Sequence, residues 1–200
     1  MLRRLLLLLG FAAVLTFAPL GLSADSAGPL VRVRVEGKTH AIFGATQPRA
    51  RAQTALEALE VASNAGEFYY HVQQTGFGPY VDQIGRYPGS GPGGWVFKVN
   101  GASPPVGADK LELKAGDVVL WYWATFTESG GPPTLELRSK AGCYRVFAQD
   151  DAGKELPAPD AVLRVDRRTF KASFTGTCIG KHGGLVHATA AGAVRSNALP

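Results

Sequence analysis

The sequence predicts an α+β domain that contains one helix, followed by a smaller all-β domain with the layout of a sandwich. Three observations lead to this fold class. Strand-type runs in the first half surround one segment with helical periodicity. A Gly/Pro-rich segment, residues 128–133, then interrupts the chain, and short strand-type runs recur roughly every 8–12 residues after it. We therefore expect a mixed sheet with one helix over residues 29–127, a linker over 128–133, and a β-sandwich over 134–200.

The first 24 residues have the layout of a secretory signal peptide. Arg3 and Arg4 precede the apolar run Leu5–Leu20, and small residues follow it. A retained anchor is the weaker interpretation, because the run contains a proline and no charged stop follows it. No later apolar stretch approaches the roughly 20 residues that a membrane span requires. The mature protein should begin near Asp25, lack a membrane span, and be secreted or held in the cell envelope.

The charge of the chain argues against a nucleic-acid partner. The formal net charge is +5, from 21 Lys and Arg against 16 Asp and Glu. Removal of Arg3 and Arg4 leaves 19 against 16, a net charge of +3. The remaining basic residues are scattered, whereas nucleic-acid binding requires a clustered stripe.

The two cysteines, Cys143 and Cys178, both lie in the last third of the chain. An oxidising compartment favours a disulfide bond between them. The alternative is a metal site in which His182 and His187 join Cys178. Its spacing matches no standard zinc motif and supplies one thiolate, so the disulfide is favoured and no metal site is expected.

The first elements follow from periodicity and capping. Leu30–Glu36 alternates valines with charged residues, as a half-buried strand does, and residues 40–51 read as a second, less regular strand. Thr54 and Glu57 have the spacing of a capping box, which predicts that a helix begins there. Its apolar positions form one stripe, and residues 64–66 end it.

Strands are also expected over residues 67–74 and 80–84, before a loop over 85–94 that contains five glycines and two prolines. The linker leads to five further short strands, which are expected at residues 134–138, 144–148, 161–165, 169–174 and 185–190.

The stretch from Gly94 to Phe126 is the centre of the first domain. Trp95–Val99 and Val118–Phe126 are strand-type runs, and Asn100-Gly101 is a strong turn signal because both residues tolerate positive φ. Both alternating sets of the second run are apolar, which is typical of a central strand covered on both faces.

All three tryptophans of the protein, Trp95, Trp121 and Trp123, lie in this stretch. Aromatic side chains of this size can fill a core or form a binding surface. One interpretation places the helix on the Val118, Leu120 and Tyr122 side of the strand, which leaves Trp121 and Trp123 to a ligand or a partner. We expect Trp121 to be mainly structural and Trp95, beside the glycine loop, to serve recognition. The candidate ligand-binding residues are Trp95, Phe97, Trp121, Trp123 and Tyr80.

Catalytic motifs are absent from the sequence. It contains no G-x-S-x-G, H-E-x-x-H, P-loop or dinucleotide-binding motif. His71 is a possible general base, but a lone histidine on a strand is usually a hydrogen-bonded surface residue. Asp82 and Asp117 are isolated carboxylates, and Asp117 is best explained as a turn residue. We therefore expect a protein that is not an enzyme.

Four segments carry a family likeness: T-A-L-E-A-L-E at 54–60, F-G-P-Y-V at 77–81, G-W-V-F-K-V-N-G at 94–101 and A-G-D-V-V-L-W-Y at 115–122. Residues 30–126 resemble a bacterial exported family of unknown function, related to the C-terminal domain of the cobalamin carriers transcobalamin and intrinsic factor. The resemblance implies a β-grasp-like fold. In the carriers this domain closes over one side of the corrinoid and a helical barrel holds the other side. That barrel is absent here.

The segment from Thr134 onward resembles carboxypeptidase-regulatory or immunoglobulin-like sandwich modules of bacterial surface proteins, which serve as spacers or adhesive units. Taken together, these features predict a non-catalytic protein that binds a ligand or a surface. A corrinoid is the first ligand that the resemblance suggests, as a ligand and not as a cofactor, and a cell-surface partner is the alternative. A structural or adhesive module of the cell envelope without a small ligand is the second functional hypothesis.

Overall fold

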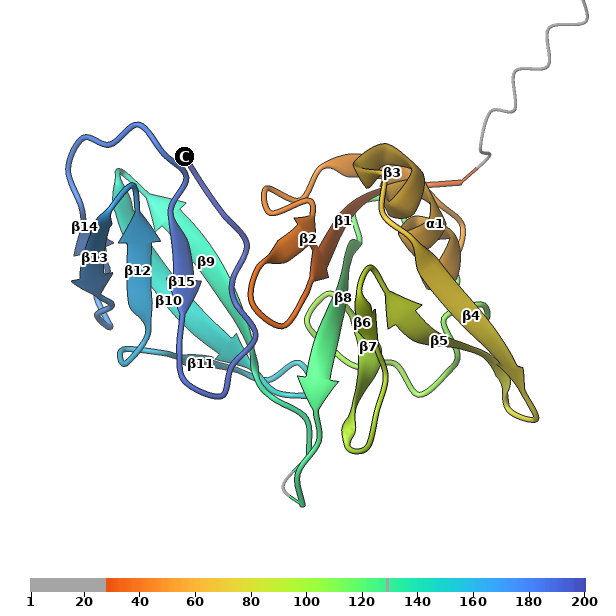
Figure 1. Cartoon of the computed structure of the whole chain (residues 1–200). Helices are drawn as coiled ribbons and strands as arrows, with labels where there is room; N and C mark the ends of the chain where they lie inside the picture. The colour runs from red at the N-terminus through yellow and green to blue at the C-terminus, as the bar shows by residue number, and fades with distance from the viewer. Residues whose placement is uncertain (1–27, 129) are drawn as a thin grey trace, which may run out of the picture.

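The computed structural model describes residues 28–128 and 130–200, and within these ranges the chain is mostly β, with one helix and four sheets. The predicted signal peptide, residues 1–24, lies outside the described residues. No helix in the two ranges is long and apolar enough to cross a membrane. Figure 1 shows strands β1–β8 and helix α1 on one side of the molecule and strands β9–β15 on the other. We call these the N-terminal part and the C-terminal part.

The largest sheet is mixed and has five strands in the order β2-β1-β8-β7, with β3 also paired to β1. Strands β1 and β8 run parallel at its centre, and the other pairs are antiparallel. The strands predicted at Leu30–Glu36 and Val118–Phe126 are confirmed as β1 and β8. The irregular strand predicted over residues 40–51 is two short strands, β2 and β3. The five strands are β1 (Leu30–Glu36), β2 (Ala41–Phe43), β3 (Arg49–Arg51), β7 (Gly93–Val99) and β8 (Val118–Thr125).

Helix α1 (Ala55–Gly66) begins at the predicted capping box. The Thr54 hydroxyl accepts a hydrogen bond from the backbone N–H of Glu57 at 3.1 Å. The Glu57 carboxylate accepts one from the N–H of Gln53 at 2.7 Å, so two free donors of the first turn are satisfied. Gly66 is the last helical residue rather than the cap. A Cβ at Gly66 would lie 2.6 Å from Cδ2 of Phe43, so close packing requires a glycine there.

A three-stranded antiparallel sheet follows the helix, in the order β4-β5-β6. Its third strand lies inside the segment that was predicted to be a loop. The backbone of that segment is fixed because the Trp95 indole donates a hydrogen bond to the carbonyl of Tyr87 at 2.8 Å. The three strands are β4 (Tyr70–Thr75), β5 (Gly78–Ile84) and β6 (Tyr87–Pro88).

The C-terminal part consists of a four-stranded sheet, in which β10 pairs with β9, β11 and β14, and a three-stranded sheet in the order β13-β12-β15. All these pairs are antiparallel. A hydrophobic core of its own lies between the two sheets. The strands are β9 (Thr134–Lys140), β10 (Cys143–Gln149), β11 (Glu155–Pro157), β12 (Val162–Val165), β13 (Arg168–Lys171), β14 (Thr177–Cys178) and β15 (His187–Thr189).

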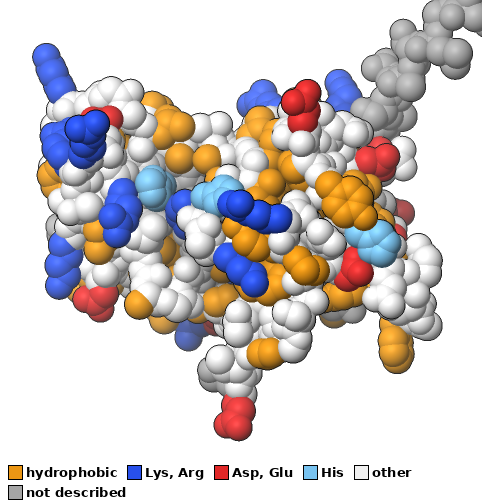
Figure 2. Space-filling model, viewed as in Figure 1, with side chains coloured by type: hydrophobic (Ala, Val, Ile, Leu, Met, Phe, Trp, Pro, Cys, Tyr) orange, Lys and Arg blue, Asp and Glu red, His pale blue; other side chains and the backbone are white. Residues whose placement is uncertain are grey.

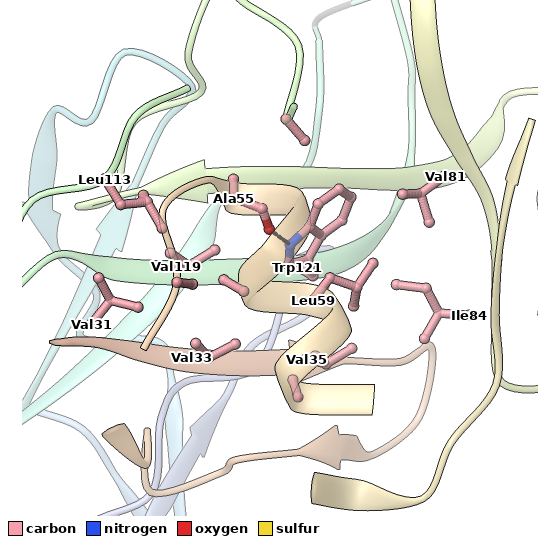
Figure 3. Close-up of a cluster of buried hydrophobic side chains, with 14 of the residues drawn as sticks. Val31, Val33, Val35, Ala55, Leu59, Val81, Ile84, Leu113, Val119 and Trp121 are labelled. Atoms are coloured by element: carbon pink, nitrogen blue, oxygen red, sulfur yellow. Dashed lines mark hydrogen bonds between the residues drawn. The ribbon is translucent and has the colours of Figure 1, made fainter. Parts of the chain in front are cut away.

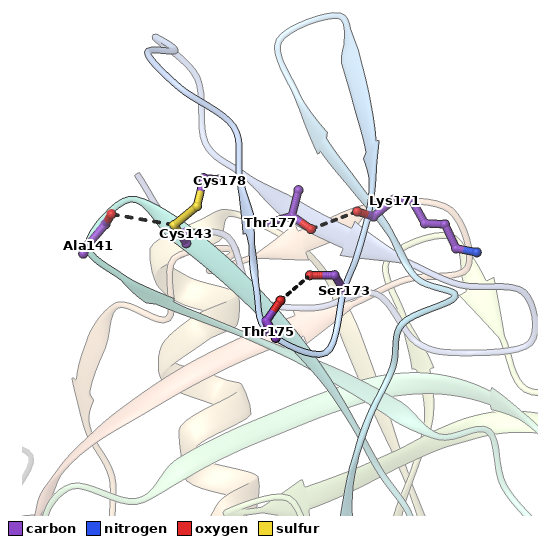
Figure 4. The surroundings of a disulfide bond; sticks show 7 residues. All are labelled: Ala141, Cys143, Lys171, Ser173, Thr175, Thr177 and Cys178. Carbon is purple, nitrogen blue, oxygen red and sulfur yellow. Dashed lines mark hydrogen bonds between the residues drawn. A yellow bond between two sulfur atoms is a disulfide. The ribbon is translucent and has the colours of Figure 1, made fainter.

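The predicted disulfide bond between Cys143 and Cys178 is confirmed, and no free cysteine is found in the described residues. The two cysteines are opposite each other in the register of β10 and β14 (Figure 4). The bond therefore pins a two-residue strand to the edge of the four-stranded sheet.

The helix covers the opposite face of β8 from the one that the sequence interpretation chose. Val119 and Trp121 face the helix, and the Trp121 indole donates a hydrogen bond to the Ala55 carbonyl at 3.0 Å (Figure 3). The reason lies in the neighbouring strand, because Val33 and Val35 pair with Val119 and Trp121. The apolar stripe of the helix covers the side on which both strands are apolar.

The other face of β8 packs against the C-terminal part. Leu120, Tyr122 and Ala124 are buried with Val194 in a small cluster of their own. The central strand is therefore covered on both faces, as its two apolar sets predicted.

Candidate functional site

A groove of about 850 Å³ lies where the N-terminal and C-terminal parts meet. Its walls come from the turn after β1, the ends of β7 and β8, the segment 130–133, and the segment 189–195 that follows β15. Backbone of glycine and proline residues forms much of the lining, and the side chains that add chemistry to it are Lys38, Thr39, Trp123, Thr125 and Arg195.

Trp123 is the aromatic residue of this groove, and it is partly buried. The Lys38 ammonium lies 3.9 Å from the centroid of its ring, within the range of a cation–π interaction. The ring also meets Trp95 edge to face, with centroids 5.8 Å apart. A Cβ at Gly93 would lie 2.6 Å from Cζ2 of the indole. The indole is therefore held in one orientation, with glycine backbone against its edge.

The structure separates the other predicted ligand-binding residues from the groove. Trp95 is 1% exposed and Trp121 is 2% exposed, so both belong to the core of the N-terminal part. Phe97 is partly buried and stacks on Trp121, with ring centroids 5.1 Å apart. Tyr80 is 43% exposed on β5 and does not line the groove. The tryptophan that lines the groove is thus Trp123, which is partly buried, rather than Trp95.

Sequence reasoning did not select Lys38, Gly93 or the segment 189–195 as parts of a site. Lys38 carried one signal, since it follows the Gly37 turn of the first strand. Nothing in the sequence indicated that residue 195 lies close to residue 38, because the two segments meet only through the packing of the two parts against each other.

Buried charges join the two parts behind the groove. Glu36 is 1% exposed and pairs with Arg34 and Arg195. Burial raises the pKa of Glu36, and the two guanidinium groups oppose this shift. Burial likewise raises the pKa of Tyr122, on the same sheet face, to about 12.

Lys98 is the second buried charge between the parts, and its side chain has no exposed surface. Its ammonium donates hydrogen bonds to the carbonyls of Gln149 and Asp150 at 3.2 and 2.8 Å. Burial lowers the pKa of Lys98, while the Asp151 carboxylate, 3.6 Å away, raises it. Lys98 belongs to the N-terminal part, and the groups that hold its ammonium belong to the C-terminal part, so this buried charge is satisfied only when the two parts are in contact.

His71 and Asp82 form a pair on the outer surface, where Nδ1 lies 2.6 Å from Oδ1. The histidine is 52% exposed and the aspartate 33% exposed. The carboxylate orients the imidazole, as the sequence interpretation of a hydrogen-bonded surface histidine expects. Among the described residues, no group of three or more His, Cys, Asp and Glu side chains is arranged to hold a metal ion.

Comparison with known proteins adds a partial family match. Residues 51–125, which run from β3 to the end of β8, match the model of a domain of unknown function, DUF4430. The chain is also similar in structure to a candidate metal-binding protein from Ruminococcus gnavus, with a TM-score of 0.37 and 14% sequence identity. That similarity covers 50% of this chain and 99% of the other, and at this level it supports no functional argument. No curated protein matches the chain.

Proposed function

We propose that this chain is an exported, non-catalytic binding protein that takes a ligand in the groove beside Trp123. The observation that carries the proposal is the partly buried indole in a groove of about 850 Å³, with the Lys38 ammonium 3.9 Å from its ring centroid. Small-molecule sites have volumes of roughly 300–1,000 Å³ and combine apolar surface with a few polar groups. Thr39, Thr125 and Arg195 supply such polar groups here.

The domain organisation that we propose has a β-grasp-like domain at residues 29–127, a linker at 128–133 and a sandwich at 134–200. A mixed sheet with one helix supports the first domain, and two sheets around a separate core support the second. The first domain would be related to the C-terminal domain of transcobalamin and intrinsic factor, as its four sequence segments suggest. The second would resemble carboxypeptidase-regulatory or immunoglobulin-like modules.

Export is part of this proposal. The signal-peptide layout of residues 1–24 and the disulfide bond support it, because disulfides persist in oxidising compartments. Mass spectrometry of material secreted by the host cell is expected to show a chain that begins near Asp25 and contains no alkylatable cysteine before reduction. A chain that begins at Met1 would contradict export with cleavage.

The ligand class that we infer has a flat apolar surface with polar groups at its rim. A flat ligand could stack on the exposed part of the indole, while the exposed Lys38 attracts acceptor groups at the rim of the groove. Corrinoids meet this description and are the first ligands to test, because of the likeness to the cobalamin carriers. Glycans, whose sugar rings also stack on tryptophan, are the second class.

Isothermal titration calorimetry with cobalamin and with oligosaccharides tests the proposal without depending on the tryptophan signal. We expect saturable binding by the wild type, and binding at least about tenfold weaker for Trp123→Ala, as for an aromatic hot spot. Phe77→Ala, an aromatic truncation outside the groove, is the matched control and should bind as the wild type does. Equal affinity of the wild type and Trp123→Ala would refute the groove as the binding site.

A second candidate function is adhesion through the β4–β5 hairpin. Its turn carries Phe77, which is 105% exposed, and Tyr80 on β5 is 43% exposed. Tyr69, which precedes β4 at the other end of the hairpin, is 58% exposed. The hairpin projects from the body of the molecule, and hydrophobic side chains are visible on the projection (Figures 1 and 2). Exposed aromatic residues of this kind mark partner surfaces. If the chain is an adhesive envelope module, Phe77→Ala should abolish attachment to cell surfaces and Trp123→Ala should not.

A further inference from the structure

A second, smaller cavity of about 230 Å³ lies between the two parts, on the sheet face opposite the helix. The N-terminal part contributes β1, β7 and β8 to its wall, and the C-terminal part contributes β9, β10 and β11. Charged and amide side chains dominate the lining, and those that bear on its chemistry are Arg32, Arg34, Lys98, Glu136, Arg138 and Gln149. This cavity shares no lining residue with the groove beside Trp123.

The two carboxylates at the cavity are already engaged. Arg138 donates a hydrogen bond to Glu136 at 2.9 Å and another to Glu155 at 2.6 Å. The Gln149 amide donates to the same two carboxylates, at 2.8 and 3.0 Å. The pKa of Glu155 is lowered by its hydrogen bond from Arg138, so this carboxylate stays ionised beside its partners. Glu136, Glu155 and Arg138 therefore form a closed network on one wall.

The opposite wall carries two guanidinium groups that form no hydrogen bond with this network. Burial lowers the pKa of Arg34, and the negative charge of Glu136 is among the charges that oppose this shift. Arg34 is 3% exposed, and its Nη1 donates to the Arg195 carbonyl at 3.0 Å and lies 3.5 Å from the Glu36 carboxylate. Its Nε is buried and has no hydrogen-bond partner. A buried donor without a partner costs about 1–3 kcal/mol, and such a group in a native structure often indicates a bound water or ion.

Arg32 stands two residues earlier on the same strand and therefore on the same face of the sheet. In the described residues it makes no ion pair, and no hydrogen bond from its side chain is found there. The spacing of alternate residues on a strand places the two arginine side chains about 6–7 Å apart along β1. Lys98, the third cation of the cavity, is held by carbonyl groups of Gln149 and Asp150.

We propose that this cavity binds one small oxyanion, a phosphate or a carboxylate, between Arg32 and Arg34. The guanidinium group presents parallel N–H donors that match the oxygens of these anions and favours them over a spherical ion such as chloride. A cavity of about 230 Å³ holds such an anion with a few waters, and it lies below the roughly 300 Å³ at which sites for larger organic ligands begin.

The proposal does not rest on the function proposed for the groove. It has a consequence for the protein as a whole, because residues of both parts surround the anion. Binding to the folded form alone raises the melting temperature in proportion to the logarithm of the anion concentration. Occupancy of the cavity would therefore strengthen the contact between the two parts.

The experiment uses the mature chain with inorganic phosphate and, separately, acetate, each compared with potassium chloride at equal ionic strength to correct for screening. We expect saturable one-to-one binding by calorimetry, and a rise in melting temperature of about 3–6 °C at phosphate tenfold above its dissociation constant. Arg32→Gln should lose both effects. Because the Arg32 side chain makes no ion pair or hydrogen bond within the described chain, and its backbone pairing in β1 is kept, this variant should fold with unchanged stability in chloride.

Arg167→Gln is the matched control, since Arg167 is an exposed arginine outside the cavity. It should keep the full response. A response to phosphate alone would assign a phosphate-type ligand, and a response to acetate, with or without one to phosphate, would assign a carboxylate. If the wild type responds to neither phosphate nor acetate more than to chloride, the cavity holds only water and the proposal is wrong. It is also wrong if Arg32→Gln binds phosphate as the wild type does.

Discussion

Arg195 donates two hydrogen bonds to one carboxylate oxygen of Glu36, from Nε at 3.2 Å and from Nη2 at 2.9 Å. The two residues are 159 positions apart in the chain. Glu36 belongs to β1 at the centre of the N-terminal sheet, and Arg195 belongs to the segment after β15. A buried ion pair of this kind specifies how two surfaces meet, even where its net contribution to the free energy of unfolding is small.

Removal of the Glu36 charge is expected to destabilise the protein strongly. Glu36→Gln keeps the shape of the side chain but leaves Arg34 and Arg195 without their carboxylate. Breaking a buried pair by removal of one partner costs about 3–5 kcal/mol. Urea unfolding of the wild type and the variant measures the difference. Glu60→Gln, at an exposed position of the helix, is the control and should change the free energy of unfolding by less than about 0.5 kcal/mol.

Trp121 and Trp123 should differ in their contributions to stability. Trp121 is 2% exposed and donates a hydrogen bond to the Ala55 carbonyl, so Trp121→Ala should cost about 3–5 kcal/mol. Trp123 is only partly buried at the groove. The loss in the free energy of unfolding should therefore be smaller for Trp123→Ala than for Trp121→Ala, by about 1–2 kcal/mol. Chemical denaturation followed by circular dichroism tests both. Equal losses would mean that Trp123 is as much a core residue as Trp121.

Reduction of the Cys143–Cys178 bond should weaken the C-terminal part selectively. The bond closes a loop of 35 residues, for which chain entropy gives a stabilisation of about 3–4 kcal/mol. All three tryptophans lie in the N-terminal part, and Trp95 and Trp121 are buried in its core, so the fluorescence reports mainly on that part. After reduction, we expect loss of β-structure by circular dichroism at lower denaturant concentration than the fluorescence change. Coincident transitions at the original midpoint would show that the bond contributes little.

His187 should make stability depend on pH in a defined direction. Burial lowers the pKa of His187 below its ordinary value of 6.5, and Arg195 and Arg164 add to this effect. The unfolded chain therefore takes up the proton at higher pH than the folded chain. Stability attributable to this residue is full above pH about 7 and falls as pH decreases through 6.5 towards the folded pKa.

The variant His187→Gln removes this titration. Its free energy of unfolding should fall less than that of the wild type between pH 7.5 and 5.5, in measurements at constant ionic strength (about 0.15 M). His71→Gln, at the exposed pair with Asp82, serves as a second histidine removal. A steeper loss of stability in His187→Gln than in the wild type would reverse the assigned direction.

Local signals predicted much of the secondary structure. The alternation of Leu30–Glu36 gave a strand with the observed bounds, because valines on one side must be buried and charges on the other need polar partners. Thr54 and Glu57 satisfy backbone donors within one turn, so the start of the helix is encoded locally. Asn100 and Gly101 both have positive φ, at 51° and 86°, as their turn signal predicted.

The prediction of which face of β8 the helix covers was wrong, and it shows the limit of what local sequence patterns can predict. Val118–Phe126 is apolar on both sides, so its own sequence does not say which side meets the helix. The answer lies in β1, whose valines pair with Val119 and Trp121 while Arg34 pairs with Leu120 on the other side. That information was present in the sequence, but it becomes usable once the parallel pairing of the two strands is known.

The sequence by itself determined most of the strands, the helix, the disulfide partners and the residue types available for binding, because each depends on periodicity, capping or a limited choice of partners. It missed the short strands β6, β11 and β14. The tertiary structure alone decided which of those residues meet. It buried Trp95 and Trp121, left Trp123 at the groove with Lys38, and brought Arg195 to Glu36. These contacts join segments that are far apart in the chain, and they depend on how two separately formed cores pack together, which no local pattern records.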